Sequence, residues 1–516
     1  MRKKSYDGGR RRLKHHDKTA STKEFKIEVD KGLDGNLASI KQMLGDPPDL
    51  VIRQLKVGET EQKIAIIYIS GLVKTDFINN NLLKAIKIHV NEGQPWNLET
   101  VYQEAVAITD TKQSDKLDSV SLDVLSGWTA FYMDGCDKVL TMNTVGGEKR
   151  SIEEPPSEML IRGPRAGFIE NIETNLALLR QAVKDPNLRF ESHKVGRRSK
   201  QQLVVAYMAG IVNSDLVKVL DERLRSIDTD HAIDSGTVEQ WIEDSFLSPF
   251  PQLIGTERPD RVTSALLEGK IAVFLDGSPF VLIAPVTLVD TLKSQEDYTQ
   301  RWVTGTLVRL LRYLSAFIAL LLPALYIAGV SYHPAMLPTR LVFSIAGSRE
   351  GVPFPAVIEA IAMAVTFEIL HEASIRLPKI IGSTIGIVGG LVIGESAVTA
   401  GIVSPVMVVV TALTAIASFT ISEYSVAIAF RFIRFAFMIA AAFLGLYGIV
   451  LVYIMLNIHL VNLKSFGIPY TVPFAPSFFK DWKDMFLRAP LLMMRRRPAH
   501  LETKDRKSAR KGGDPR

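Results

Sequence analysis

The chain has 516 residues, of which 22% are charged and 47% are hydrophobic, and its formal net charge is +6. Its one cysteine, Cys136, excludes a disulfide framework within the chain and a metal site built from cysteines. Charged side chains are frequent from Met1 to about Arg301 and sparse from Leu307 to Val461. This asymmetry indicates a charged N-terminal region followed by a hydrophobic membrane region, so we do not expect a soluble enzyme.

The first residues lack the features of an export signal. Met1–Lys26 contains basic side chains but no apolar core of the kind that a secretory signal peptide requires. We therefore expect the N-terminal region to lie on the cytoplasmic side of the membrane. The first hydrophobic segment would then act as the insertion signal.

Basic residues gather at both ends of the chain. They are Arg2, Lys3, Lys4, Arg10, Arg11, Arg12 and Lys14 at the start, and Arg495, Arg496, Arg497, Arg506, Lys507, Arg510 and Lys511 at the end. In a membrane protein such runs favour anionic lipids, which attract each basic residue near the surface by about 1 kcal/mol. We prefer this interpretation to nucleic-acid binding; a solvated tail without a partner is the alternative.

The N-terminal region contains an internal repeat. Ile64–Asp76 and Leu203–Asp215 both open with an apolar run and continue into a helical pattern, which is typical of a strand, a loop and a helix. Asp134-Gly135 and Asp276-Gly277 each lie between apolar runs, which predicts β-hairpins because both turn positions tolerate positive φ. The predicted fold is an α/β N-terminal region of two related subdomains, followed by an α-helical multi-span membrane domain.

The expected domains follow from these patterns. They are a basic disordered tail (1–29), α/β subdomain 1 (30–150), α/β subdomain 2 (151–300), a membrane domain (301–465) and a basic C-terminal tail (466–516).

The membrane domain is expected to contain four to six helical segments, since about twenty apolar residues cross a bilayer. The candidates are Leu307–Val330, Pro355–Ala373, Ile380–Ile421 (long enough for two spans) and Tyr424–Val461, with a membrane core at Phe435–Leu456. Basic residues favour the cytoplasmic ends of membrane helices. If five spans simply alternated in direction, the basic residues that flank them could not all lie on the cytoplasmic side. Either one segment is re-entrant or the last stretch turns back.

The second of these segments carries ionisable groups, namely Glu359, Glu368, His371 and Glu372. At 100° per residue the last three share one helix face and Glu359 lies on the opposite face. Acidic groups are costly against lipid, so this helix should face protein, water or the membrane surface. We treat all four as pore or gating candidates. The alternative is that they pair with nearby basic groups (Arg376, Lys379 or His371), as in an i,i+4 pair between Glu372 and Arg376.

A glycine stripe follows at every fourth residue, formed by Gly382, Gly386, Gly390 and Gly394. Such spacing gives a smooth helix face against which another helix packs closely, although glycine is frequent in membrane helices in general. Glu395, directly after the stripe, is a further pore or gating candidate.

Several unusual motifs occur in order along the chain. They are Arg162–Arg180 (RGPRAGFIENIETNLALLR), Ser248–Leu253 (SPFPQL), Thr256–Arg261 (TERPDR), Asp276–Leu282 (DGSPFVL), Val352–Pro355 (VPFP), Arg376–Pro378 (RLP) and Ile385–Gly390 (IGIVGG). Together they resemble the A subunit of the GerA-type germinant receptors of endospore-forming bacteria. The resemblance covers roughly residues 30–475.

The resemblance implies a place in the inner membrane of the dormant spore. It implies work with a transporter-like, nutrient-binding B subunit and a lipoprotein C subunit. It also implies self-association, as a pentamer, into a channel through which monovalent cations leave when nutrient binds. No cofactor is implied.

Two other readings remain open. A non-conducting scaffold of the receptor complex, or the related sporulation protein that assists dipicolinic acid release, would carry similar motifs. An enzyme is disfavoured because the sequence shows no nucleophile–base pair, phosphate-binding loop or metal cluster. His371-Glu372 begins a zinc-protease pattern, but Ile375 occupies the position of its second histidine.

Overall fold

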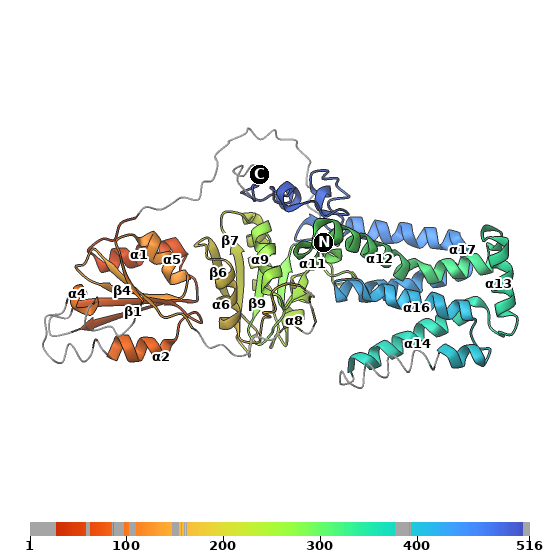
Figure 1. The fold of residues 1–516 in the computed structure, drawn as a ribbon, viewed down its shortest axis with the longest axis horizontal. Helices are drawn as coiled ribbons and strands as arrows, with labels where there is room; N and C mark the ends of the chain where they lie inside the picture. Colours follow the sequence, from red (N-terminus) through yellow and green to blue (C-terminus); the bar gives the residue numbers. More distant parts are fainter. Residues whose placement is uncertain are drawn as a thin grey trace.

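The structure is a computed structural model. It describes residues 27–57, 62–84, 86, 97–102, 110–146, 154–155, 157–158, 160, 162–376, 392 and 394–508. Two α/β subdomains and a bundle of long helices follow one another along the longest axis of the molecule (Figure 1). The C-terminal segment returns from the bundle to subdomain 2 (Figure 1).

The two subdomains contain antiparallel five-stranded sheets with equivalent strand orders, β1-β2-β4-β5-β3 and β6-β7-β9-β10-β8. In subdomain 1 the strands are β1 (Leu50–Val57), β2 (Gln62–Ile69), β3 (Thr111–Ser114), β4 (Trp128–Met133) and β5 (Val139–Asn143). In subdomain 2 they are β6 (Leu188–Val195), β7 (Gln201–Met208), β8 (Ile254–Thr256), β9 (Ile271–Leu275) and β10 (Val281–Ala284). The equivalent orders agree with the internal repeat. The two predicted hairpins are confirmed, with Gly135 and Gly277 both at φ 87°.

Helices cover the sheets. Subdomain 1 contains α1 (Leu33–Leu44), α2 (Thr75–Phe77), the π-helical turn η1 (Ile78–Leu83), α4 (Leu98–Thr100) and α5 (Leu117–Leu125). Subdomain 2 contains α6 (Ile172–Ala182), α7 (Ser214–Arg225), α8 (Ser235–Ile242), α9 (Pro259–Glu268), α10 (Leu288–Leu292) and α11 (Glu296–Thr299). Alternate residues of β7 face opposite sides: Val204 packs with α6 and α9, whereas Val205 packs with α7 and α8. The sheet of subdomain 2 is therefore a middle layer between two helical layers.

A buried ion pair joins the two subdomains. Arg180 of α6 is fully buried, and its Nε and Nη2 donate to the two carboxylate oxygens of Asp49 at 2.8 and 3.1 Å. The guanidinium also lies 4.4 Å from the ring centre of Phe190 in β6. This bidentate, stacked geometry suits arginine and not lysine.

The helical part consists of α12 (Trp302–Ser331), η3 (Pro334–Met336), α13 (Thr339–Arg349), α14 (Ala356–Arg376), α16 (Pro405–Phe419) and α17 (Tyr424–Asn462). The helix α13 crosses the end of the bundle that lies farthest from subdomain 2 (Figure 1). The expected segments Leu307–Val330 and Pro355–Ala373 correspond to α12 and α14, and α16 occupies the second half of Ile380–Ile421. Most of the first half of that stretch lies outside the described residues.

The helix α17 is a hairpin of two antiparallel arms. A straight helix would separate Phe430 from His459 by about 44 Å. Both rings nevertheless lie about 6 Å from the ring of Phe250, at 6.1 and 6.2 Å. The reversal occurs at Gly445, whose φ of 59° and ψ of −138° are not helical. The last apolar stretch therefore turns back, and the expected single core at Phe435–Leu456 is wrong because the turn interrupts it.

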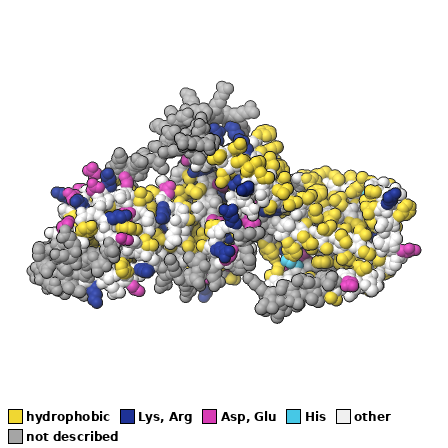
Figure 2. Space-filling view, in the orientation of Figure 1, with side chains coloured by type: hydrophobic (Ala, Val, Ile, Leu, Met, Phe, Trp, Pro, Cys, Tyr) yellow, Lys and Arg dark blue, Asp and Glu magenta, His cyan; other side chains and the backbone are white. Residues whose placement is uncertain are grey.

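Among the described residues, α12 and α17 have the length and apolar composition of a membrane-crossing helix, α17 when its two arms are counted together, and α16 is apolar but has only 15 residues. Hydrophobic side chains cover most of the visible face of the helical part, whereas charged side chains are spread over the α/β subdomains (Figure 2).

The C-terminal segment packs against the rest of the protein as far as Ser508. It contains the two-stranded ribbon of β11 (Lys464–Ser465) and β12 (Ile468–Pro469), and the 3₁₀ turns η4 (Asp481–Asp484), η5 (Leu491–Met493) and η6 (Ala499–Leu501). Phe466 joins the core of subdomain 2, and the backbone N–H of Lys504 donates to the carbonyl of Ile211 at 3.0 Å. The region expected to be a basic tail is therefore largely a part of the fold.

We predict that Gly445→Ala destabilises the helical part by about 1–3 kcal/mol, since a non-glycine residue is strained in this conformation. A Cβ at this position would also lie 3.0 Å from His333 Nε2 and Tyr332 Cβ. The measurement is the temperature at which the detergent-solubilised chain loses its monodisperse elution. Gly347→Ala in α13 is the matched control, because nothing lies within 4 Å of its added Cβ. Equal melting of the two variants would contradict the prediction.

Candidate functional site

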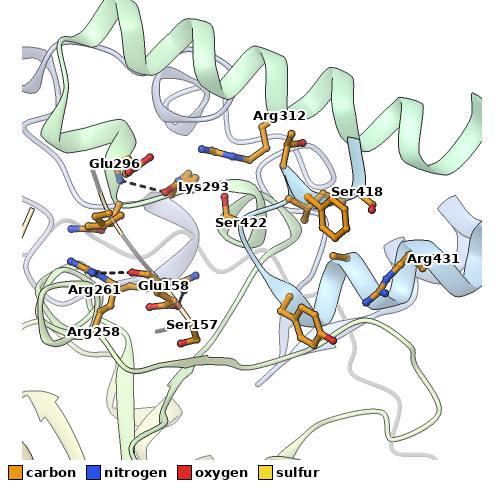
Figure 3. A pocket seen from close by; sticks show the side chains of 18 of the residues that line it. Ser157, Glu158, Arg258, Arg261, Lys293, Glu296, Arg312, Ser418, Ser422 and Arg431 are labelled. Atoms are coloured by element: carbon orange, nitrogen blue, oxygen red, sulfur yellow. Dashed lines mark hydrogen bonds and ion pairs between the residues drawn. The ribbon is translucent and has the colours of Figure 1, made fainter. Parts of the chain in front are cut away.

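A cavity of about 420 Å³ separates subdomain 2 from the near ends of α14, α16 and α17 (Figure 3). Its charged lining comes from both parts of the protein and includes Glu158, Arg261, Lys293, Arg312, His371 and Arg431. Hydroxyl groups of Ser157, Ser294, Ser418, Thr420 and Ser422 complete a polar wall. The cavity therefore lies where a displacement of the soluble region would reach the helices.

Arg261 of α9 links the soluble region to the start of α17. Its Nη1 lies 2.7 Å from Glu158 Oε1, and its Nη2 lies 3.0 Å from Oε2 of Glu423, the N-cap residue of α17. Burial alone would lower the pKa of Arg261, but the two carboxylates hold it above its ordinary value. The guanidinium is therefore a permanent cation between two elements that are 162 residues apart in sequence.

The first turns of α12 contain a buried charge network. Asp297 of α11 accepts hydrogen bonds from Arg309 Nε at 2.9 Å and from Arg312 Nη1 at 3.1 Å. Arg309 Nη1 also donates to Asp484 of the C-terminal segment at 2.9 Å. Arg309 is fully buried and Asp297 is only 1% exposed. The cations at the start of this hydrophobic helix thus point inward, towards carboxylates of the soluble region and the C-terminal segment.

Lys293 extends the network beside the cavity. Its Nζ lies 3.1 Å from Asp484 Oδ2 and 3.6 Å from Asp290 Oδ1. Burial by itself would lower the pKa of Lys293, but these carboxylates raise it well above the ordinary value. In return, burial would raise the pKa of Asp484, but Lys293 and Arg309 lower it. All of these groups are therefore charged at neutral pH.

Glu359 of α14 is held inside the helical bundle. Its Oε1 lies 3.0 Å from Arg349 Nη2 at the end of α13, and its Oε2 accepts the backbone N–H of Ser404, the N-cap residue of α16, at 2.9 Å. Its side chain has no exposed surface. Within one chain this carboxylate joins three helices.

Glu368 lies nearer the cavity. Its Oε1 is 2.9 Å from Arg431 Nη1 and its Oε2 is 3.7 Å from Arg434 Nη2, both in α17, and its side chain is 38% exposed. Its ion-pair partners among the described residues thus come from a separate helix and not from Arg376, and Lys379 lies outside the described residues. Arg434 Nε is buried without a hydrogen-bond partner among the described atoms, so this ion pair is incompletely satisfied.

The remaining candidates are spread over the bundle. Glu372 forms the expected i,i+4 pair with Arg376 at 2.6 Å on the surface, which confirms that pairing. The His371 ring lies 5.2 Å from the ring of Phe419 at the end of α16. Glu395 is exposed, and a Cβ on the buried Gly394 would lie 3.5 Å from Val408 of α16.

Three of the four stripe glycines cannot be placed. Gly382, Gly386 and Gly390 lie outside the described residues. In the described part of the chain, no group of three or more His, Cys, Asp or Glu side chains has the geometry of a metal site.

The sequence reasoning missed the network at α12 and the partners of Glu368. Arg309 and Arg312 lie at the start of the first hydrophobic segment, where the sequence pattern predicts no more than a basic flank. Their spacing of three residues, which puts both on one helix face, was the available signal for a shared partner. Nothing local indicated Asp484, which lies 175 residues away.

Comparison with known sequences gives consistent results. The family described as "Bacillus/Clostridium GerA spore germination protein" matches residues 38–500. Spore germination protein GerLA of Bacillus cereus is 46% identical over 477 residues, which is 92% of this chain and 97% of that protein. Spore germination protein KA of Bacillus subtilis (strain 168) is 41% identical over 495 residues, covering 96% and 91%. The uncharacterized membrane protein YfkQ of the same strain is 41% identical over 488 residues, covering 95% of each chain.

Among solved structures, the N-terminal domain of the A subunit of the Bacillus megaterium spore germinant receptor GerK3 is 35% identical to this chain. The match covers 50% of this chain and 96% of that one, with a TM-score of 0.41.

We predict that Asp297→Asn destabilises the protein by about 3–5 kcal/mol, because it leaves two buried guanidinium groups without their shared counter-charge. Asp215→Asn is the control: Asp215 is exposed beside Lys218, so its loss should cost less than about 1 kcal/mol. Thermal unfolding of both variants in detergent measures the difference. A melting temperature of Asp297→Asn equal to that of the control would show that the network contributes little.

We also predict that Glu239→Gln stabilises subdomain 2 at pH 8 but not at pH 4. Burial, together with Glu243, raises the pKa of Glu239 in α8 to about 7. A raised pKa favours the folded state while the group is protonated, and this contribution is lost as the pH rises through 7. Since the substitution removes the ionisation cost, the gain at pH 8 should be about 1–2 kcal/mol.

Urea unfolding followed through Trp241, two residues along the same helix, measures this effect. Glu222→Gln on the exposed side of α7 is the control and should show no dependence of this kind. A gain for Glu239→Gln that is equal at both pH values would contradict the assignment.

Proposed function

Because the chain belongs to the GerA family of spore germination proteins, we propose that it is the A subunit of a nutrient germinant receptor in the spore inner membrane. In this proposal it self-associates, as a pentamer, into a nutrient-gated cation channel. A transporter-like B subunit and a lipoprotein C subunit complete the receptor. The N-terminal region lies in the cytoplasm, and the basic ends meet anionic lipids.

The observation that carries the proposal is the division of the helical part into an apolar exterior and a charged interior. Large apolar side chains such as Leu307, Phe317 and Phe443 are more than half exposed. The arginines of the same helices, Arg309 of α12 and Arg434 of α17, are buried in ion pairs. A water-soluble protein would show the reverse distribution, whereas a helical bundle in lipid requires this one. A relative named as a membrane protein, YfkQ, supports the same placement.

The hairpin of α17 supports a multi-span arrangement. Its arms, residues 424–444 and 446–462, are about 30 and 25 Å long at 1.5 Å per residue, close to the thickness of a bilayer core. With α12, the apolar α16 and the returning α14, they form a bundle that enters and leaves on the side of subdomain 2. This arrangement fits a soluble region and a C-terminal segment on one side of the membrane.

Glu368 is the best candidate for the conduction path. Glu359 is fully occupied in holding α13 and α16, whereas Glu368 is partly exposed and paired with arginines of another helix. Rings of carboxylates around an assembly axis favour cations. We propose that Arg431 neutralises Glu368 in the closed state, and that gating separates this pair when α14 moves relative to α17. Glu395, which is exposed, would add to the negative lining, whereas Glu372 is paired with Arg376 on the surface and lies outside the proposed path.

The test is cation flux from liposomes that contain the purified chain, alone and with its B and C partners. We expect nutrient-dependent flux from the complex. Glu368→Gln should reduce the flux several-fold because it removes the ring of charge. Gly394→Leu should abolish the dependence of the flux on nutrient, because the larger side chain crowds Val408. Glu372→Gln, which breaks only an exposed surface pair, is the matched control and should retain most of the flux.

The outcomes separate the channel from the scaffold. A complex that assembles with both partners but passes no cations under any condition would show that the chain is a non-conducting scaffold. Normal flux in Glu368→Gln would leave the channel intact but remove Glu368 from the path.

A further inference from the structure

The C-terminal segment follows the first turns of α12 outside subdomain 2. The backbone N–H of Arg488 donates to Thr306 Oγ1 at 3.1 Å, and the ring of Phe486 lies 5.1 Å from the ring of Tyr313. Between these contacts, Arg309 Nη1 donates to the Asp484 carbonyl at 3.1 Å. Residues 484–488 therefore lie beside residues 306–313 of α12, about 10 Å of its length. These contacts fix the level of the segment along the helix axis.

The outer side of this segment is apolar and aromatic. Phe479 is 74% exposed and Leu487 is 58% exposed, and Trp482 and Phe486 are each more than a third exposed. Hydrophobic side chains run from the helical part onto the segment that projects above the start of α12 (Figure 2). The apolar face thus continues sideways from the helix at the level where the soluble region ends.

Charges on the segment are sorted by sign. Asp481 accepts the backbone N–H of Ala499 at 2.9 Å, and Asp484 binds Arg309 and Lys293, so both acids point into the fold. The cations Lys480, Lys483 and Arg496 are exposed. From 474 to 496 the exposed charged side chains are therefore all positive, and Lys480 and Lys483 are next in sequence to the exposed Phe479 and Trp482.

We propose that residues 474–496 form a membrane-surface anchor. Phe479, Trp482, Phe486 and Leu487 enter the boundary between headgroups and acyl chains, and Lys480, Lys483 and Arg496 bind anionic lipid headgroups. Aromatic side chains with a basic rim are the usual composition of elements that lie in this interfacial layer. The inference rests on the membrane placement proposed above and adds a lipid-binding surface to it.

Lipid fits this surface better than a second copy of the chain. A symmetric contact would bring the same patch of two copies together and set like charges against each other, with no exposed acid on the segment to offset them. Anionic headgroups supply that counter-charge at the surface. The anchor also holds the Asp484 carboxylate beside Arg309, so lipid would stabilise the start of α12 in its present position.

The test uses the full chain with Cys136→Ser in vesicles of phosphatidylcholine with phosphatidylglycerol. A single cysteine replaces Leu487, Phe317 or Lys218 in turn and carries an environment-sensitive fluorophore. Leu487 reports on the anchor, Phe317 on the exposed face of α12, and Lys218 on the exposed surface of subdomain 2. A spin-labelled lipid and aqueous iodide are the two quenchers. Phe479→Cys provides a second anchor position in case the Leu487 variant misfolds.

We expect the label at Leu487 to be quenched by lipid whose spin label lies at a shallow depth in the bilayer, and the label at Phe317 by lipid whose spin label lies deep. Iodide, and not the spin-labelled lipid, should quench the label at Lys218. In phosphatidylcholine alone, or with Lys480, Lys483 and Arg496 all changed to Gln, lipid quenching at Leu487 should fall at least about twofold while Phe317 is unchanged. The first result supports the anchor, and the second supports its preference for anionic headgroups.

Three results would overturn the inference. If iodide but not lipid reaches Leu487 while lipid reaches Phe317, the anchor is absent although the membrane placement holds. If neither quencher reaches Leu487, and this protection occurs only at a high protein-to-lipid ratio, a second copy of the chain covers the patch. If lipid reaches neither Leu487 nor Phe317, the membrane placement itself fails, and the proposed function fails with it.

Discussion

The carboxylate of Asp297 is the group on which the junction between soluble and helical parts depends. It lies at the end of subdomain 2, is almost fully buried, and balances two guanidinium groups that belong to the first hydrophobic helix. Asp484 of the C-terminal segment completes the balance through Arg309. One charged centre therefore ties α11 and the start of α12 to the C-terminal segment, whose Asp484 lies 175 residues beyond Arg309. Because buried charges are tolerated only when paired and hydrogen-bonded, none of the three can move away alone without a large cost.

The same pairing explains how a chain with a net positive charge can present an apolar surface along its helices. The arginines at the starts of α12 and α17 turn towards Asp297 and Glu368, so the outward faces of these helices keep mainly apolar and aromatic side chains. Satisfying the charges inside and exposing the hydrophobic side chains is the reverse of a soluble protein, and it suits lipid as the solvent. Residues 474–496 follow a similar rule: Asp481 and Asp484 point inward, whereas Lys480, Lys483 and Arg496 are exposed.

Features set by local patterns were predictable from the sequence, and features set by distant partners were not. The repeat and the two Asp-Gly hairpins depend on neighbouring residues, and the structure confirms the hairpins. The i,i+4 pair of Glu372 and Arg376 is local for the same reason. The partners of Glu368 lie on α17, 63 residues away from it, and no periodicity reports such a contact. The sequence indicates a reversal of the last stretch only as one of two options and does not place it, because the apolar run contains Gly445 and Gly448 and the sequence does not show which of them adopts positive φ.

Two kinds of attachment now distinguish the helices of the bundle. The start of α12 is clamped to subdomain 2 by fully buried ion pairs, so a rotation of the subdomain carries α12 with it. The helix α14 meets the junction across a cavity, where His371 lines the wall, and it is joined to α17 by a partly exposed pair at Glu368. A partly exposed pair is weaker than a buried one, since water replaces each partner at modest cost. Motion of the soluble region would therefore open the α14–α17 contact before it broke the α12 clamp. In the proposed gate, the contact at Glu368 is therefore the one that opens, and the ion pairs of Arg309 transmit the motion of subdomain 2 to α12.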